Sequence, residues 1–214
     1  VKIIGSDPGI SAEFNGGTHM SMEDIGVLRS IPELVIYEPV DVAQFKQALP
    51  QIVAYEGPVY IRMFRKTIDD VFTDANYKFD LFGADCIQEG TAVTIFCSGI
   101  MVQETMKANE ILKQEGIDAE IINIHTIKPI DRDAVVASAK KTGAVVVAEN
   151  HNVIGGLTSA VCEVLMEEYP VPLRAVGVKD RFGQVGKMPF LKEEYHMTAK
   201  DIVSAVKEVI RLNK

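Results

Sequence analysis

Short apolar runs alternate along the first third of the chain with segments whose apolar residues recur every three to four positions. The runs at 1–5, 34–37 and 59–64 are predicted to be strands, and the periodic segments at 21–30 and 42–50 to be helices. Asp41 is the predicted cap of the second helix, and Pro50 is expected to kink or end it. Ser21 and Asp24 have the spacing of a capping box for the first helix.

A second alternating block follows residue 90. Strands are expected at 92–97, 119–124, 144–148 and 173–178. Helices are expected from 101 to a stop at Gly116, after Asp131, from 157 to about 169 and from Thr198, which forms a capping box with Asp201. Alternating strands and helices with nearly continuous apolar strands favour mostly parallel sheets. The sequence therefore predicts an α/β protein of two α/β units.

The periodicity fails between the two blocks, where polar residues dominate. We therefore expect a first unit at residues 1–68, a linker at 69–90 and a second unit at 91–214.

Composition narrows the class of protein. The 214 residues carry a formal net charge of −8, and no basic stripe is present to neutralise phosphates, which argues against a nucleic-acid partner. Three cysteines without a close pair suit a reducing compartment. The longest uncharged run, 90–103, is too short to span a bilayer, and we expect a cytoplasmic chain with no membrane partner.

Several common catalytic motifs are absent from the sequence, among them GxGxxG, GxxxxGK[ST], GxSxG, HExxH and CxxC. The pair Gly155-Gly156 before a helix either holds an anion or only permits a tight turn, and the tight turn is the commoner use. The cysteines are expected to be inert core residues. His125, His151 and His196 are expected to be structural.

The segment 9–24 sets one histidine, His19, in a glycine-rich turn ahead of a helix. His19 either caps that helix or bonds within the turn, or it faces a ligand that the small turn allows to approach. Arg65 follows the third predicted strand and is expected at the same sheet edge, where α/β folds bind ligands. Its guanidinium either grips a carboxylate or phosphate or forms an ordinary surface ion pair.

Motifs in both blocks resemble the transketolase family of thiamine-diphosphate-dependent enzymes. Residues 1–66 resemble the latter part of its pyrimidine-binding domain, whose first part is missing here. Residues 92–212 resemble its C-terminal domain, with matching motifs at 123–131, 148–151, 154–157 and 179–183. The resemblance is strongest to the separate C-terminal subunits of split transketolases, and it implies a partial pyrimidine-binding domain followed by a C-terminal-like domain.

The resemblance implies roles for individual residues. His19 matches a histidine near the cofactor's aminopyrimidine and the substrate, so it is the predicted catalytic and cofactor-binding residue. Arg65 matches the arginine that binds the sugar phosphate, and Asn15 is expected to bond a substrate hydroxyl. Asp7 stands where transketolases commonly have a phosphate-binding histidine, and its carboxylate would repel a phosphate. Phe14-Asn15 replaces an acidic pair, and Met20 replaces a glutamine.

The family's catalytic glutamate and its GDG-type motif for the metal and diphosphate are absent from this sequence. The chain is therefore expected to bind thiamine diphosphate and Mg²⁺ only with an N-terminal partner subunit, and to be inactive alone. No metal-ligating residues are predicted within it. In the assembled homo-oligomeric enzyme it would help transfer a two-carbon ketol unit between sugar phosphates, a reaction of the pentose phosphate pathway.

Three alternatives remain open at this point. The chain could correspond to part of a 2-oxoacid dehydrogenase beta subunit or of a deoxyxylulose-phosphate synthase. It could also be a non-catalytic, partner-binding subunit, which the residues Asp7, Phe14 and Met20 favour.

Overall fold

Two mixed β-sheets organise the computed structural model, which describes residues 1–73 and 77–213. The first sheet has the order β1-β3-β2-β7, and the second has the order β4-β6-β5-β8-β9. Their strands are β1 (Lys2–Ser6), β2 (Val35–Tyr37), β3 (Val59–Met63), β4 (Asp85–Gln88), β5 (Val93–Cys97), β6 (Ala119–Asn123), β7 (Thr126–Lys128), β8 (Val145–Asn152) and β9 (Leu173–Val178). All neighbouring strands are parallel except the outer strands β7 and β4, which run antiparallel to β2 and β6. The predicted α/β class with mostly parallel sheets is confirmed.

Eight helical segments connect these strands in the described ranges. They are the 3₁₀ segment η1 (Gly9–Thr18), α1 (Asp24–Leu28), α2 (Val42–Ala54), α3 (Met101–Gln114), α4 (Arg132–Thr142), α5 (Leu157–Glu168), α6 (Met188–Glu194) and α7 (Ala199–Leu212). None of the helices in the described ranges is long and apolar enough to cross a membrane.

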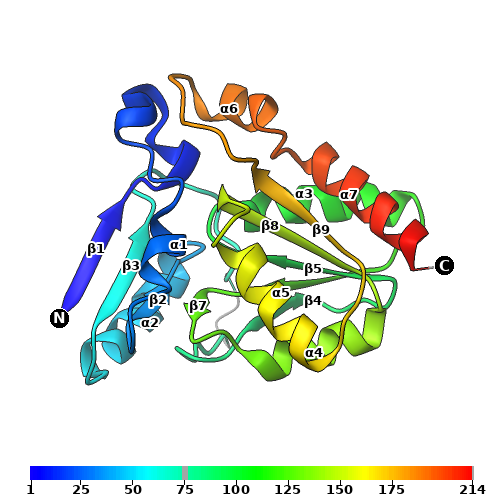
Figure 1. The fold of residues 1–214 in the computed structure, drawn as a ribbon, viewed down its shortest axis with the longest axis horizontal. Coiled ribbons are helices and arrows are strands. Elements are labelled where there is room, and N and C mark those ends of the chain that lie inside the picture. The colour runs from blue at the N-terminus through cyan, green and yellow to red at the C-terminus, as the bar shows by residue number, and fades with distance from the viewer. Residues whose placement is uncertain (74–76, 214) are drawn as a thin grey trace.

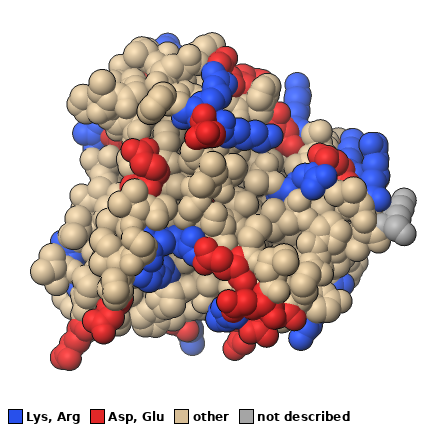
Figure 2. Space-filling view, viewed as in Figure 1, with Lys and Arg blue, Asp and Glu red and all other residues tan. Residues whose placement is uncertain are grey.

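Helices cover both faces of the second sheet (Figure 1). One face packs Ile95 and Cys97 of β5 against α3 and α7, and the other packs Phe96 against α4 and α5. The first sheet has α2 on one face, where Ile52 lies against Ile61 in a small apolar cluster. Figure 2 shows acidic and basic side chains interspersed over one face of the molecule, with no broad area of one sign.

The second face of the first sheet shares its core with the second unit. Ile36 and Tyr60 belong to the same buried apolar cluster as Leu157 and Val161 of α5. The second unit also contributes a strand to the first sheet, because β7 follows β6 in the chain but pairs with β2. No strand was predicted at residues 126–128.

The expected linker is partly ordered into these sheets. Residues 74–76 of that range lie outside the described residues. Phe79 and Leu81 are buried against the first sheet, and β4 pairs with β6 of the second. The proposed unit boundaries at 68 and 91 stay a prediction.

Most of the predicted helix caps are present in the structure, whereas the predicted helix end at Pro50 is not. Asp41, Asp131 and the Thr198–Asp201 capping box are confirmed as caps. The helix does not end at Pro50, one of the two expected outcomes: α2 continues to Ala54, and the proline lies on its exposed side. A proline removes one backbone donor, and the exposed side of a helix lets water satisfy the carbonyl left without a partner.

The capping box predicted at Ser21 is also wrong. α1 begins after Glu23, which forms no side-chain cap, and the carboxylate of Asp24 instead accepts bonds from Tyr60 and Arg62. A buried guanidinium binds a carboxylate more strongly than a backbone N–H does, which explains why the local pattern was overridden.

Candidate functional site

The candidate site lies at the edge of the first sheet where β1 and β3 end. Ser6 is in register with Met63, so the segments that follow the two strands lie side by side. There the carboxylate of Asp7 accepts bonds from the Arg65 backbone nitrogen, at 3.2 Å, and from the Arg65 Nε. Asp7 is buried, whereas the Arg65 side chain is 62% exposed. The structure thus brings two predicted site residues together and leaves most of the guanidinium facing solvent.

The other two predicted residues lie in and directly after η1. This segment is interrupted by positive φ angles at Glu13 and Gly16, and His19 follows its last turn. The His19 ring is exposed, with Nδ1 2.9 Å from the Thr18 hydroxyl, and within the described residues its Nε2 has no hydrogen-bond partner. The imidazole therefore bonds within the turn and does not cap α1.

Asn15 is also exposed, and its carbonyl accepts the Thr18 hydroxyl at 3.4 Å. Its side-chain amide is thus at the surface of the same turn as the imidazole. A second ion pair ties this turn to the end of β3: Lys66 pairs with Glu13, whose other oxygen accepts the Met188 backbone nitrogen at 3.0 Å. η1 and the residues after β3 therefore form one continuous surface.

The glycines of this turn are needed for packing. A Cβ at Gly17 would lie 2.5 Å from the Gly183 carbonyl, and one at Gly16 would lie 2.8 Å from Val185. The segment 183–185 therefore fills the space that a side chain at either position would need, whereas the approach of a ligand to this turn stays a prediction. Beside this contact a cavity of about 390 Å³ lies between Gly17, Met20 and the segment 180–183.

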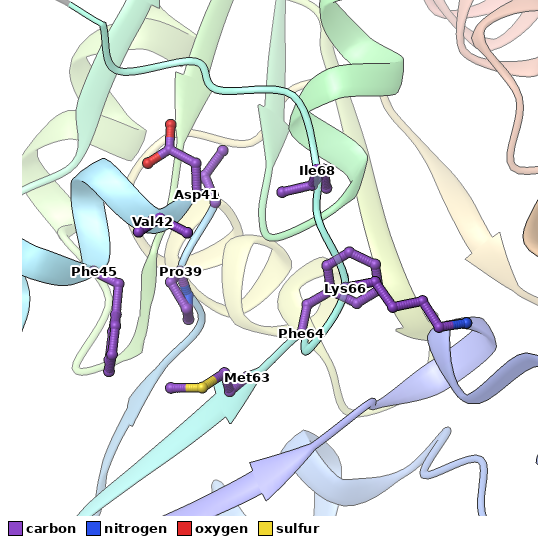
Figure 3. Close-up of a pocket in the computed structure, with 9 residues that line it drawn as sticks. Pro39, Asp41, Val42, Phe45, Met63, Phe64, Lys66 and Ile68 are labelled. Atoms are coloured by element: carbon purple, nitrogen blue, oxygen red, sulfur yellow. The ribbon is translucent and has the colours of Figure 1, made fainter.

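An apolar cavity of about 90 Å³ lies at the ends of β2 and β3 (Figure 3). Phe45, Met63 and Ile68 are among its apolar walls. Asp41 borders it, but its carboxylate is already bonded to the backbone nitrogens of Gln44, Val71 and Phe72. The cavity therefore offers apolar contact and little chemistry.

A buried ionic network lies directly beneath the candidate site, and sequence analysis missed it. Arg62 is 1% exposed, with Nε 2.9 Å from Asp24 and a terminal nitrogen 2.5 Å from Glu38. Burial alone would raise the pKa of Asp24, but the Arg62 charge together with the hydrogen bonds from Arg62 and Tyr60 lowers that pKa. The Asp24 carboxyl is thus held ionised in the interior. An arginine within an otherwise apolar strand was the available signal.

This network joins the two units. The second terminal nitrogen of Arg62 donates to the Asn150 carbonyl at 2.8 Å, and the Ser98 hydroxyl donates to Glu38 at 2.7 Å. The Asn150 side chain in turn bonds the Pro8 carbonyl and the Ile10 nitrogen, at 2.9 and 3.0 Å. The motif at 148–151 therefore holds the segment that leads into η1.

Glu149 and His151 of the same motif are buried and structural. Glu149 accepts bonds from the Leu157 and Thr158 nitrogens at the start of α5, at 2.6 and 3.0 Å, and burial raises its pKa to about 7. A Cβ at Gly156 would collide with this carboxylate. The group at this helix N-terminus is thus the protein's own side chain, and the structural interpretation of Gly155-Gly156 holds. Burial lowers the pKa of His151 to about 4.

The structure also shows the surroundings of His125 and His196. His125 is buried, with Nδ1 3.0 Å from the Thr126 hydroxyl, and burial lowers its pKa to about 4. His196 is exposed, in a backbone conformation with positive φ.

The expectation that all cysteines are core residues is wrong. Cys97 is buried, but Cys86 is exposed because β4 is an outer strand of its sheet, and Cys162 is half-buried. Desolvation and the nearby Glu89 raise the pKa of Cys86 to about 11, so its thiol stays protonated. Cys86, Glu89 and Glu120 could offer three metal ligands, but Lys141 pairs with both carboxylates.

Models of two protein families match the chain. Residues 1–69 match the transketolase pyrimidine binding domain, and residues 83–202 match the transketolase C-terminal domain. Among curated relatives, the chain is 56% identical over 209 residues to the 6-deoxy-6-sulfo-D-fructose transketolase subunit SqwH of Clostridium sp. (strain MSTE9). That match covers 98% of this chain and 65% of the relative.

More distant relatives lead to the same family. The chain is 33% identical over 211 residues to a subunit of the apulose-4-phosphate transketolase of Phocaeicola vulgatus, covering 99% of this chain and 67% of that protein. A solved structure described as a split gene transketolase, inactive beta4 tetramer, is 40% identical and superimposes with a TM-score of 0.90, covering all of this chain and 67% of the other. The chain thus spans about two thirds of the length of these three proteins. It belongs to the transketolase family.

Proposed function

We propose that this chain is the C-terminal part of a split, thiamine-diphosphate-dependent transketolase. Together with a partner that supplies the remainder of the enzyme, it would transfer a two-carbon ketol unit between sugars that carry an anionic group. The observation that carries the proposal is that His19 and Arg65 are both exposed and follow two segments, η1 and β3, which the Lys66–Glu13 ion pair joins at the end of the first sheet.

The residues present suit one side of a thiamine diphosphate site. His19 is exposed, and it lies in the chain between Gly17 and Met20, which both line a cavity. The cations at this surface, Arg65 and Lys66, are each paired with a carboxylate, so they do not form a diphosphate site. We therefore propose that the partner holds the diphosphate and Mg²⁺. When bound, the cofactor supplies the nucleophilic carbon for cleaving and forming the C–C bond.

The chain's own residues would bind and orient the substrate. The terminal nitrogens of Arg65 would grip its anionic end, and the Asn15 amide would bond a hydroxyl. His19 would exchange a proton with a substrate hydroxyl through Nε2, while the Thr18 hydroxyl bonded to Nδ1 keeps the ring oriented. The relatives are named for a sulfo-sugar and for a sugar phosphate, so both terminal groups are candidates for Arg65.

Assembly is part of the proposal. Ile3 and Ile4 of the outermost strand β1 are 50% and 59% exposed, although they point to opposite faces of the sheet. Apolar exposure on both faces of a strand favours cover by another polypeptide. We propose that the chain forms oligomers and is inactive without its partner. The solved structure described as an inactive beta4 tetramer supports this proposal.

The experiment reconstitutes the enzyme. The chain, a candidate partner, thiamine diphosphate and Mg²⁺ are combined, and ketol transfer is followed in a coupled assay. We expect turnover only in the complete mixture. His19→Ala should lower kcat by about 10²-fold or more through loss of proton transfer. Arg65→Met should mainly raise KM, by about 10-fold or more, because a charged hydrogen-bond donor to the substrate is lost.

Arg132→Met is the matched control, since Arg132 is also exposed and paired with carboxylates but lies on α4 of the second unit. It should leave both constants unchanged. A complex that binds thiamine diphosphate but whose rate is untouched by His19→Ala would instead establish the non-catalytic, partner-binding role.

A further inference from the structure

The backbone places the Asp7 carboxylate against Arg65. Asp7 has a positive φ of 54°, a conformation that aspartate and asparagine tolerate better than most residues. Its nitrogen donates to the Met63 carbonyl at 2.8 Å, which extends the β1–β3 pairing by one residue. Its carboxylate, 4% exposed, then receives both the backbone nitrogen and the Nε of Arg65. Arg65 therefore presents its terminal nitrogens to a ligand with a fixed negative charge directly behind them.

The positive charge of the neighbouring Lys66 is also compensated by a carboxylate. Lys66 pairs with Glu13, which the Met188 nitrogen also holds in place. Burial alone would raise the pKa of Glu13, but Lys66 and the bond from Met188 outweigh it and lower that pKa. Glu13 therefore stays charged. Asp7 and Glu13 each compensate one cation, and Lys187 is a further cation near Glu13, so a ligand at Arg65 meets hydrogen-bond donors whose own charge is offset by an adjacent carboxylate.

The two candidate terminal groups differ in charge more than in shape. A sulfonate and a phosphate ester both present three oxygens around a tetrahedral centre. A phosphate ester carries about −1.5 to −2 at pH 7, since its second pKa is about 6. A sulfonate carries one negative charge throughout this range. Attraction to Arg65 and repulsion by Asp7 both grow in proportion to the ligand charge, so the Asp7 carboxylate takes more of this attraction away from the phosphate ester than from the sulfonate.

We infer that Asp7 makes the anion site at Arg65 select a sugar with a terminal sulfonate over the matching sugar phosphate. The inference rests on the proposed function, because it requires Arg65 to bind the anionic end of the substrate. Asp7 is then a positioning and specificity-determining residue that acts through Arg65 and touches no reacting atom.

The test uses the reconstituted complex with 6-deoxy-6-sulfofructose and fructose 6-phosphate as donors. We expect kcat/KM for the sulfonate to exceed that for the phosphate by about 10-fold or more at pH 7.5. Asp7→Asn keeps the shape and tolerates the backbone conformation, and it should bring the ratio close to one, mainly by lowering KM for the phosphate. Asp133→Asn, at an exposed carboxylate on α4, should leave the ratio unchanged.

A pH series separates charge from shape. Lowering the pH from 7.5 to 5.5 converts much of the phosphate ester to its monoanion, so the preference of the unaltered complex for sulfonate should shrink, while the ratio of the Asp7→Asn complex stays nearly flat. Glu13→Gln, which uncovers the Lys66 charge, is a second variant that should shift the ratio toward phosphate if Asp7→Asn folds poorly. An unaltered complex that prefers phosphate, or a ratio that neither variant moves, overturns the inference.

Binding distinguishes failure of this inference from failure of the proposed function. Calorimetry on the His19→Ala complex gives Kd for both sugars without turnover. A tenfold preference for the sulfonate in Kd, combined with no turnover by the unaltered complex, would support selection and overturn ketol transfer. Equal Kd values alongside normal turnover would overturn selection only, and binding of neither sugar would overturn both.

Discussion

Two arginines three residues apart show how differently one sheet edge and its interior use the same side chain. Arg62, within β3, is buried between two carboxylates and a backbone carbonyl from the second unit. Arg65, just beyond β3, faces a single buried carboxylate, and most of its guanidinium is exposed. A guanidinium whose N–H donors are all bonded within the protein has a structural role, whereas one with free donors can bind a ligand.

The contrast extends to the surroundings of each arginine. Around Arg62 the groups come from both units, so the network fixes how the units pack. Around Arg65 and Lys66 the partners are Asp7 and Glu13, which belong to the same unit and lie on the segment from β1 to η1. The structural layer therefore lies directly beneath the proposed binding layer and holds its backbone in place.

The largest effect is expected from breaking the buried network. Arg62→Met leaves Asp24 and Glu38 buried without their counter-charge, and it should lower the free energy of unfolding by about 3–5 kcal/mol. Urea unfolding of the chain, followed by circular dichroism, measures the change. Arg132→Met is the control and should change stability by less than about 1 kcal/mol. Equal effects of the two substitutions would contradict a structural role for the buried arginine.

The next effect concerns pH dependence at Glu149, which lies in the same motif as Asn150. Burial raises the pKa of this carboxyl to about 7, above its ordinary value of 4.5. The stability that this raised pKa contributes is complete below about pH 4.5 and is lost as the pH rises through 7, because the folded state must then bury a charge.

Glu149→Gln removes this titration. The loss of unfolding free energy between pH 5 and pH 8 should therefore be smaller in the variant by roughly 3 kcal/mol. Urea unfolding at a series of pH values gives the two slopes. His151, which lies 3.9 Å from the Glu149 carboxylate, has a lowered pKa that acts in the opposite direction. Parallel slopes would show that Glu149 does not bind an extra proton in the folded state.

A smaller effect is expected at the edge of the buried network. Ser98→Ala removes the hydroxyl that donates to Glu38 and should cost about 2 kcal/mol, since a bond to a charged group is lost. Thr91→Ala removes an exposed bond to Asp118 and should change stability by less than about 0.5 kcal/mol. Similar losses in the two variants would mean that Ser98 does not bond a buried charge.

The smallest effect on stability is expected at Arg65 itself. Arg65→Met should change the free energy of unfolding by less than about 1 kcal/mol, because the pair with Asp7 is largely exposed on the arginine side. Raising the salt concentration from 0.1 to 1 M should shrink even this difference, since salt screens exposed charges. A loss of unfolding free energy comparable to that of Arg62→Met would show that Arg65 has a structural role.

Local signals in the sequence were enough for much of the fold. Asp41 and Asp131 were recognised as caps because capping depends on one side chain and the next three backbone nitrogens. The strands β5 and β8 were recognised because they are buried on both faces and read as continuous apolar runs. Strand β7 was missed because its three residues acquire strand structure only by pairing with β2.

The candidate site divides in the same way. Arg65 was expected at the strand end, and its position beside Asp7 follows from the parallel register of β1 and β3. Nothing local to Arg62 or Asn150 shows that they meet across 88 residues of sequence. Glycines 16 and 17 were explained as room for a ligand, and only the structure shows that residues 183–185 also pack against them.

The sequence by itself determined the α/β class, the family and the caps, because these depend on periodicity and on contacts within a few residues. Tertiary structure alone decided that Arg62 is buried and that the Asp7 carboxylate pairs with the exposed Arg65. It also decided which residues pack beside the glycine turn. Charge and burial are set by groups that are distant in the chain, and electrostatic interactions depend on both the separation of charges and their exposure to water.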